Sequence, residues 1–280
     1  MTTLRLQTWQ QPDDPFMVPL ENFAKAVKQG TGGSIQVELY PAVPLGEIAE
    51  AVRQGEVEMG LILSRLLQDS PSLMDAPQLP FLYNDEDGLM AAVQAGIGDL
   101  MTEQIKDITV LDWTTIGLSH LFSRVRMLDE PGDVVGLKIR TGGMQWEAVT
   151  EWGGTPLLMA LAEVYKALEE EKIHGAIFSP SLYVALKLYE LQQLAPYFFC
   201  EGYAFANLAA LSINSDAWKS LDANTQQIII DAAGDYVNEM LETVKNVDAA
   251  ALQTIEGYGV EVYTLTPEER AIWREASQPV

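Results

Sequence analysis

The first part of the chain combines two spacings of hydrophobic residues. Segments 4–9, 34–40 and 57–63 are short apolar or alternating runs, which are typical of strands. Asp13-Asp14-Pro15 favours a helix start, and the residues that follow share one helical face: Phe16, Leu20, Phe23, Ala24 and Val27. A shorter helix is expected over 46–54. The pattern predicts a βαβαβ unit, which builds a parallel sheet covered by helices.

The same order of elements returns in the middle of the chain. Short apolar runs predict strands over 137–140, 155–159 and 173–178. Helical spacing predicts helices over 144–152, 162–171 and 181–192. The sequence itself does not repeat, but the order of elements does. We therefore expect a second βαβαβ unit.

The last part of the chain contains one long helix. A strand is expected over 208–213, a helix opening at Asn214, and continuous helix from about 225 to 256. About 30 residues at 1.5 Å each span roughly 45 Å, which is more than one small lobe. A strand over 259–263 and a capped helix at Thr266-Pro-Glu-Glu follow.

These elements predict an α/β protein of two lobes, with mixed, mostly parallel sheets and a long helix that bridges the lobes. We expect residues 1–119 with about 208–250 in the first lobe, and 120–207 with about 251–280 in the second. Ligands of open α/β sheets bind beyond the carboxyl ends of the strands. Two such lobes facing each other predict a cleft that closes around its ligand.

Composition narrows the range of partners. The 280 residues are 48% hydrophobic, which is enough for a large core. Lys and Arg number 17 against 40 Asp and Glu, so the formal net charge is −23. This charge argues against binding to nucleic acids or anionic membranes. It also means that a site for an organic acid must make the negative electrostatic potential of the protein locally positive, and a buried arginine does this.

Cysteine content and hydropathy leave the compartment open. Cys200 is the only cysteine, so no internal disulfide forms, and its apolar surroundings predict a buried thiol. No run approaches 18 apolar residues, and the N-terminus shows no hydrophobic signal-peptide core. We expect either a cytoplasmic protein or a chain in which Met1 stands in place of a removed signal.

The segment Gly136-Leu-Lys-Ile-Arg-Thr-Gly-Gly143 carries the clearest chemical signal. A strand ends at Arg140, two glycines follow, and a helix is expected to begin near Met144. A guanidinium presents a planar fork of donors that matches a carboxylate with two hydrogen bonds. The N–H groups at a helix start add a positive dipole end. The segment predicts a site for an organic acid, although a structural ion pair of Arg140 is the alternative.

Motifs along nearly the whole chain resemble the extracytoplasmic solute-binding proteins of tripartite ATP-independent periplasmic (TRAP) transporters, of the C4-dicarboxylate type. Residues 133–140 resemble the family sequence DLKGLKIR closely. Each other motif is weak alone, but their order and spacing are specific; they lie in 31–38, 41–46, 79–82, 154–168 and 214–221. The resemblance implies a two-lobed protein that captures an organic acid and delivers it to a membrane permease.

The resemblance also assigns pocket positions, and several of them depart from the family pattern. Arg140 matches the family's invariant arginine, but a second common arginine would fall near Ser119-His120. A family amide contact is Phe178 here, two acidic positions are His174 and Ile177, and a first-lobe carboxylate falls on Leu63, beside a retained Ser64. All these departures remove polarity, which argues against a dicarboxylate or sugar acid.

The predicted ligand contacts come from both lobes. They are Arg140, Phe178, Trp9, Ser64, Tyr203, Asn207, Ser119 and Gly143. For Phe178 and Trp9 the alternative is core packing, and Gly143 either admits the ligand or only caps a turn. His174 either tunes the pocket or is a satisfied structural histidine. No residues show metal-ligand spacing, so neither a metal nor a cofactor is expected.

Together these observations predict a solute-binding protein of a TRAP transporter, located in the periplasm. The expected ligand is a monocarboxylate with an apolar or aromatic body, and the expected partners are the permease subunits. A ligand sensor for a signalling partner, or a binder of a dicarboxylate or sugar acid, is the alternative. The sequence contains no nucleophile–base pair, phosphate loop or dinucleotide fingerprint, so we expect no enzyme activity.

Overall fold

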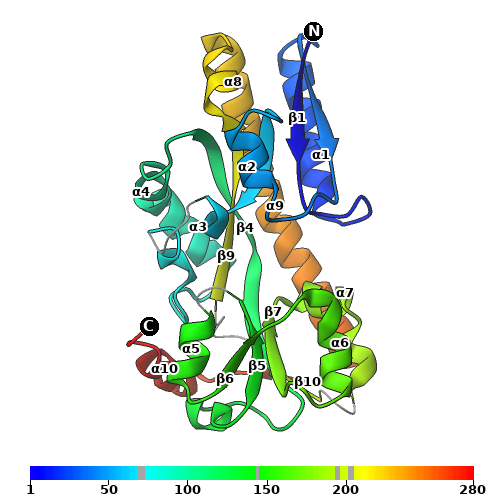
Figure 1. Ribbon diagram of the computed structural model, residues 1–280, viewed down its shortest axis with the longest axis vertical. Coiled ribbons are helices and arrows are strands. Elements are labelled where there is room, and N and C mark those ends of the chain that lie inside the picture. The colour runs from blue at the N-terminus through cyan, green and yellow to red at the C-terminus, as the bar shows by residue number, and fades with distance from the viewer. Residues whose placement is uncertain (68–72, 143–144, 193–195, 201–204) are drawn as a thin grey trace. The chain divides into compact units, whose positions relative to one another are not determined.

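The computed structural model describes residues 1–280 except 68–72, 143–144, 193–195 and 201–204, and at 199 and 200 it describes the backbone alone. The chain forms two compact units (Figure 1). The first unit contains residues 1–76, 90–116 and 207–244; the second contains 77–89, 117–206 and 245–280. Segment 77–89, which the sequence placed in the first lobe, lies in the second unit.

The first unit is built on a sheet with the strand order β2-β1-β3-β9. β1 (Thr2–Gln7) runs parallel to both β2 (Ile35–Tyr40) and β3 (Met59–Leu63). β9 (Phe205–Asn214) runs antiparallel to β3. The helices of this part of the chain are α1 (Met17–Gly30), α2 (Ile48–Arg53), α4 (Gly98–Thr102) and α8 (Ser215–Lys219). The predicted βαβαβ unit is confirmed.

Helix α1 shows why this part of the fold could be predicted from the local sequence. The carboxylate of Asp14 accepts a hydrogen bond from the backbone N–H of Phe16 at 3.0 Å, just before the helix begins. The buried face is formed by Met17, Pro19, Leu20, Phe23 and Val27. Phe23 packs edge-to-face on Tyr236 with ring centroids 6.3 Å apart. Burying this stripe stabilises the helix far more than its intrinsic propensity does.

The second unit contains a mixed sheet with the order β4-β7-β5-β6, to which β8 and β10 add at β4. β5 (Lys138–Thr141) runs parallel to β6 (Thr155–Leu158) and to β7 (Gly175–Phe178). β4 (Ile108–Ser123) runs antiparallel to β7 and to β8 (Tyr197–Cys200), which pairs with β10 (Glu261–Thr264). The helices are α5 (Gln145–Glu151), α6 (Leu161–Glu169), α7 (Pro180–Ala185) and α10 (Pro267–Ala276).

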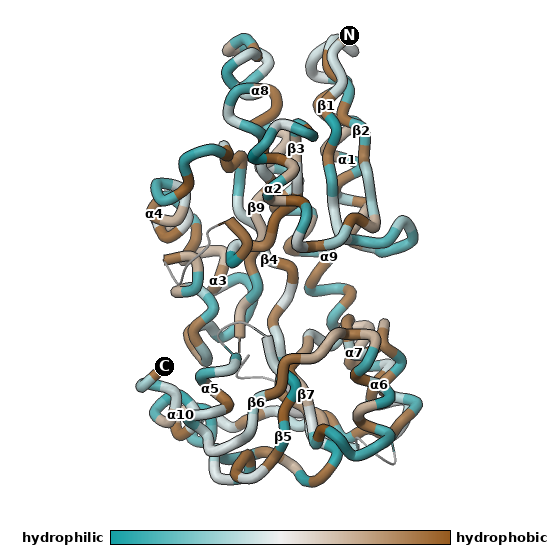
Figure 2. Tube along the Cα trace, in the orientation of Figure 1, coloured by the Kyte–Doolittle hydropathy of each residue, from teal (hydrophilic) through white to brown (hydrophobic). Residues whose placement is uncertain are grey.

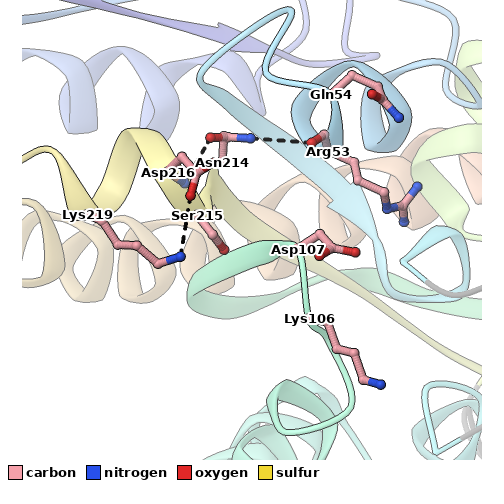
Figure 3. Close-up of a pocket in the computed structure, with 8 residues that line it drawn as sticks. All are labelled: Arg53, Gln54, Lys106, Asp107, Asn214, Ser215, Asp216 and Lys219. Atoms are coloured by element: carbon pink, nitrogen blue, oxygen red, sulfur yellow. Dashed lines mark hydrogen bonds and ion pairs between the residues drawn. The ribbon is translucent and has the colours of Figure 1, made fainter.

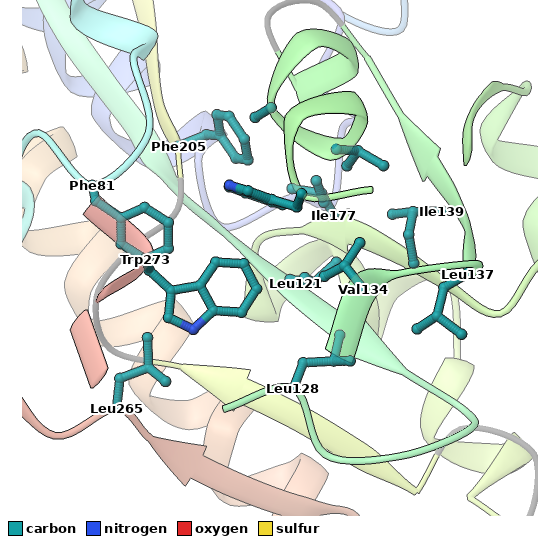
Figure 4. Close-up of a cluster of buried hydrophobic side chains, with 13 residues drawn as sticks. Phe81, Leu121, Leu128, Val134, Leu137, Ile139, Ile177, Phe205, Leu265 and Trp273 are labelled. Carbon is teal, nitrogen blue, oxygen red and sulfur yellow. The ribbon is translucent and has the colours of Figure 1, made fainter. Parts of the chain in front are cut away.

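The two faces of this sheet carry separate hydrophobic cores, because successive side chains of a strand point to opposite faces. One core joins Leu121, Ile139 and Ile177 to Trp152 and Trp273 (Figure 4). Its indole rings meet edge-to-face, with centroids 4.9 Å apart. The other core joins Phe122, Ala176 and Phe178 to side chains of α6, α7 and β8.

Gly175 lies where β7 closely approaches the backbone of β4. A Cβ atom at this position would lie 2.1 Å from the carbonyl oxygen of Phe122. Real Cβ atoms do not come so close, so β7 packs against β4 here only because residue 175 has no side chain.

Two helices connect stretches that belong to different units along the chain. α9 (Ala223–Gly257) has 35 residues and passes from the first unit to the second after Val244. α3 (Glu86–Ala92) passes from the second unit to the first after Leu89. Figure 2 shows hydrophobic and hydrophilic stretches alternating along α9, as expected for an amphipathic helix. The predicted α/β fold with its long helix is confirmed.

Three expectations about elements need correction. Strand β1 ends at Gln7, so Trp9 lies beyond it in a bend. The single helix expected over 181–192 is divided into α7 and a 3-10 turn, because Lys187 takes a left-handed backbone conformation with φ 54°. The 16-residue strand β4 was not predicted at all.

Candidate ligand-binding site

Arg140 occupies a defined position on β5. Its neighbours Ile139 and Thr141 are buried, so the side chain of Arg140 points to the opposite face of the sheet and is half-buried. It is in register with Ala176 on β7 and Leu157 on β6. The alternation of the strand therefore sends the guanidinium toward the core that contains Phe178.

Two contacts with described residues orient the guanidinium. The Nε–H donates to the carbonyl oxygen of Met159 at 3.3 Å. The Cζ atom lies 4.9 Å from the centroid of the Phe178 ring, within the range of a cation–π interaction. One contact is to the backbone and the other to a rigid ring, so neither requires a flexible partner. The arrangement can hold a planar fork of donors in a fixed direction, which suits a carboxylate.

Phe178 is the last residue of β7 and is 1% exposed. Its ring stacks on Phe122 with centroids 5.9 Å apart, and Tyr183 meets Phe122 edge-to-face at 5.0 Å. Of the two roles considered from the sequence, core packing describes this environment. Direct contact of Phe178 with a ligand stays a prediction, and its described contact with the site is through Arg140.

Trp9, Ser64 and Asn207 lie at one edge of the sheet in the first unit. β1 and β3 run parallel and end at this edge, so Trp9 and Ser64 both follow carboxyl ends of strands. β9 runs antiparallel to β3 with Ala209 opposite Leu63, so Asn207 lies near its beginning at the same edge. Ser64 is buried, and Trp9 and Asn207 are half-buried. The structure thus brings three of the predicted contacts together.

Ser119 lies elsewhere in the second unit. It is buried in β4, next to His120, which is in register with Phe178. Alternation along the strand places Ser119 on the face of Leu121, opposite the face that carries Arg140 and Phe178. The structure does not bring Ser119 together with Arg140. The predicted contacts Tyr203 and Gly143 lie outside the described residues, as does the side chain of Cys200.

The two histidines occupy structural positions. His120 is buried, with its ring centroid 5.8 Å from that of Phe198, and burial lowers its pKa from 6.5 to about 3. His174 precedes β7, at the end of that strand opposite to Phe178, and its Nδ1 accepts from the backbone N–H of Lys138 at 3.0 Å. Partial burial, then Lys138 and Arg124, lower the pKa of His174. These contacts favour a structural role for His174.

Exposed apolar side chains occur in the chain at or soon after the carboxyl ends of β5 and β6, and two of them were not named from the sequence. Trp146, in the first turn of α5, is 41% exposed, and Leu158, the last residue of β6, is 72% exposed. Leu158 is in register with Thr141, so alternation places its side chain on the face of the sheet opposite to Arg140. Leu161, at the start of α6, is also exposed. Large apolar side chains that follow strand ends are the signal that would have identified them.

A polar pocket of about 310 Å³ lies in the first unit, and none of the predicted contacts lines it (Figure 3). Its walls come from the end of α2, the segment before β4 and the start of α8: Arg53, Gln54, Lys106, Asp107, Asn214, Ser215, Asp216 and Lys219. Asn214 fixes one wall, since its amide donates to the carbonyl of Val52 at 2.9 Å and its oxygen caps α8. Cations and acids are mixed here, so the pocket shows no preference for an acid.

In the described ranges, no three His, Cys, Asp or Glu side chains gather as metal ligands would. No helix in that part of the chain has the length and apolar content needed to span a bilayer.

A model of the family "Bacterial extracellular solute-binding protein, family 7" matches residues 7–280. The chain belongs to this family. The match confirms the resemblance to the solute-binding proteins of TRAP transporters, and the family is extracytoplasmic.

Several known proteins are similar to the chain in sequence or in fold. The C4-dicarboxylate-binding periplasmic protein DctP of Rhodobacter capsulatus is 28% identical over 96% of this chain and 82% of its own. A TRAP periplasmic solute-binding protein of Ochrobactrum anthropi has a TM-score of 0.93 at 24% identity, covering 99% of this chain and 88% of its own. Another, from Ralstonia eutropha, binds (S)-2-acetolactate and has a TM-score of 0.84 at 25% identity, covering 99% and 91%.

Proposed function

We propose that this protein captures a small organic acid outside the cytoplasm, anchors its carboxylate on Arg140 and delivers it to the membrane subunits of a TRAP permease. The observation that carries the proposal is the fixed guanidinium, bound to the Met159 carbonyl and stacked over Phe178. Family membership supports the binding role, the periplasmic location and the permease partner. The protein binds its ligand and does not convert it.

The ligand that we propose is a monocarboxylate with an apolar or aromatic body. The support comes from the sequence, in which Leu63 and Phe178 replace polar groups of the family pattern with apolar surface. Burying about 100 Å² of such surface stabilises a complex by roughly 2.5 kcal/mol. The expectation that two lobes close around this ligand stays a prediction from the sequence.

A dicarboxylate or sugar acid is the second candidate, and the names of relatives favour it. DctP of Rhodobacter capsulatus is described as binding C4-dicarboxylates, and YiaO of Escherichia coli K12, 24% identical, as binding 2,3-diketo-L-gulonate. Against it, the sequence shows no second arginine near Ser119. Both candidates place a carboxylate on the same anchor.

Binding measurements on a panel of acids distinguish the two proposed ligand classes. Thermal shift followed by calorimetry would compare aryl- and indolyl-alkanoic acids with C4-dicarboxylates and uronates. We expect the aromatic acids to raise the melting temperature. Stabilisation by dicarboxylates or uronates alone would overturn the proposed ligand class. Recovery of the bound acid unchanged after long incubation, checked by NMR, tests the absence of turnover.

The anchor itself is tested by Arg140→Ala. Truncating one partner of a desolvated charge pair costs about 2–5 kcal/mol of binding, which is about 30- to several-thousand-fold in Kd. Arg274→Ala, on the exposed surface of α10, is the matched control and is expected to leave Kd unchanged. Equal affinities for the wild type and Arg140→Ala would rule out the proposed function.

A further inference from the structure

Helices α3 and α9 meet in the second unit through charged side chains. Lys245 of α9 donates to both carboxylate oxygens of Asp87, at 3.0 and 3.2 Å, in the first turn of α3. Asp248 lies three residues after Lys245, so both side chains are on the same face of α9. Glu86 is the residue before Asp87. The ion pair therefore brings Glu86 toward Asp248.

Both of these acids are buried. Glu86 is 6% exposed and Asp248 is 7% exposed. The carboxylate of Asp248 accepts a hydrogen bond from the backbone N–H of Ser181 at 3.0 Å, which joins α9 to the start of α7. Carboxylates in such positions are rarely both ionised, because burial removes the water that stabilises their charge.

The charges around Glu86 add to this effect. Asp85 and Asp87 lie next to it in the chain, and α9 presents Asp248 and the single cation Lys245, whereas α7 presents the neutral Ser181. Burial, followed by repulsion from the three aspartates, raises the pKa of Glu86 from 4.5 to about 7. Burial raises the pKa of Asp248 from 3.8 to about 6, against the hydrogen bonds from Ser181. Asp248 is one of the charges that raise the pKa of Glu86, so the protonation of Glu86 depends on its neighbour across the two helices.

We propose that Glu86 and Asp248 form a proton-dependent junction between α3 and α9. The junction is closed while the pair retains a proton, and it loosens when that proton passes to solvent and both carboxylates are charged. The part that loosens is the first turn of α3, where Gly88 N–H donates to the Asp85 carboxylate at 2.7 Å and Leu89 N–H to the Asp85 carbonyl at 3.1 Å.

The junction lies on the two helices along which the chain passes between its units, after Leu89 in α3 and after Val244 in α9. A change in its protonation therefore acts on connecting segments and not on an isolated surface turn. This inference concerns residues apart from the ligand anchor. It stands or falls independently of whether Arg140 binds an acid.

Hydrogen exchange of the full-length protein tests the junction. The amides of residues 86–92 would be followed between about pH 4.5 and 8, after correction for the intrinsic exchange rate. In the closed state the buried acids hold a proton up to about pH 7, and opening releases it to solvent. The equilibrium constant for opening of α3 should therefore rise up to tenfold per pH unit to about pH 7 and then level off. Amides of β4, followed in the same samples, report global unfolding separately.

Glu86→Gln keeps a neutral group in place and should flatten the pH dependence. Glu103→Gln, an exposed glutamate on the segment after α4, is the matched control and should behave as the wild type does. If Glu86→Gln does not fold, Asp248→Asn serves instead and should narrow the pH range of the rise. A flat wild-type profile overturns the proposal, and so does a rise that is as steep in Glu86→Gln as in the wild type. Where Asp248→Asn is used instead, a rise over the same pH range as in the wild type overturns it.

Discussion

The guanidinium of Arg140 lies over the ring of Phe178, with Cζ 4.9 Å from the ring centroid. Phe178 is itself fixed in the core by stacking on Phe122. The direction of the arginine is thus set by a buried ring and by the backbone carbonyl of Met159. A side chain held in this way loses little conformational freedom when it binds an anion.

The fork of Arg140 should matter as much as its charge. Arg140→Lys keeps the charge but loses the two parallel donors, so we expect ligand affinity to fall by about 1.5–3 kcal/mol, about 10- to 150-fold in Kd. Calorimetry with the best acid of the panel measures this. Arg274→Lys should leave Kd unchanged. An Arg140→Lys variant with wild-type affinity would mean that the carboxylate is not bound by a fork.

Phe178 should contribute to binding through the arginine. Phe178→Leu removes the aromatic face, and we expect the binding free energy to weaken by about 0.5–2 kcal/mol. Kd should therefore rise about 2- to 30-fold. The free energy of unfolding should also fall, because the stacking on Phe122 is lost. Phe23→Leu, which removes a comparable ring contact with Tyr236, should lower stability alone. The role assigned to Phe178 is wrong if both variants bind equally well.

His120 should make the protein sensitive to acid. Its pKa is about 3 in the folded state against 6.5 normally, so the unfolded state binds the proton first and stability falls as pH drops below about 6.5. Urea unfolding at about pH 6.5 and 5 should show the wild type losing about 2 kcal/mol more than His120→Leu. The buried acids Glu86 and Asp248 act with the opposite sign, but they are present in both proteins and cancel in the comparison. Parallel pH profiles would contradict this assignment.

Gly175 should tolerate no side chain. Gly175→Ala places a Cβ against the carbonyl oxygen of Phe122, so the strands must separate, and we expect a loss of about 3 kcal/mol or more. Gly234→Ala, in α9, meets no atom within 4 Å and should instead stabilise by about 0.5–1 kcal/mol. Urea unfolding of the two variants gives the comparison. Equal stabilities would show that β7 moves freely away from β4.

Features that depend on local sequence were predictable. The cap at Thr266 is an example: its hydroxyl accepts from Glu269 N–H at 3.2 Å, and the Glu269 carboxylate accepts from Thr266 N–H at 2.7 Å. Asn214 caps α8 in the same local manner. The apolar spacing that predicts α1 and α9 also needs only neighbouring residues.

Features that depend on distant residues were not predictable. Strand β4 has residues in both units and buries both of its faces toward its end, so it lacks the simple alternation of a half-buried strand. The end of α7 depends on the left-handed conformation of Lys187, which lysine rarely adopts. In the proposed site, Arg140 was named from the strand sequence alone, and its role in binding stays a proposal. The burial of Phe178 could not be foreseen, because it depends on Phe122, a residue of the unpredicted strand.

The hydrogen bond from Arg140 to residue 159 has a consequence for how this protein can change over time. The acceptor is a main-chain oxygen, which every amino acid supplies, so the side chain at 159 can be exchanged without releasing the arginine. The neighbouring positions 158 and 161 face outward and are equally open to replacement. If Arg140 anchors the ligand as proposed, substitutions at these positions can change which ligand body is preferred, while the contact that orients the arginine is kept.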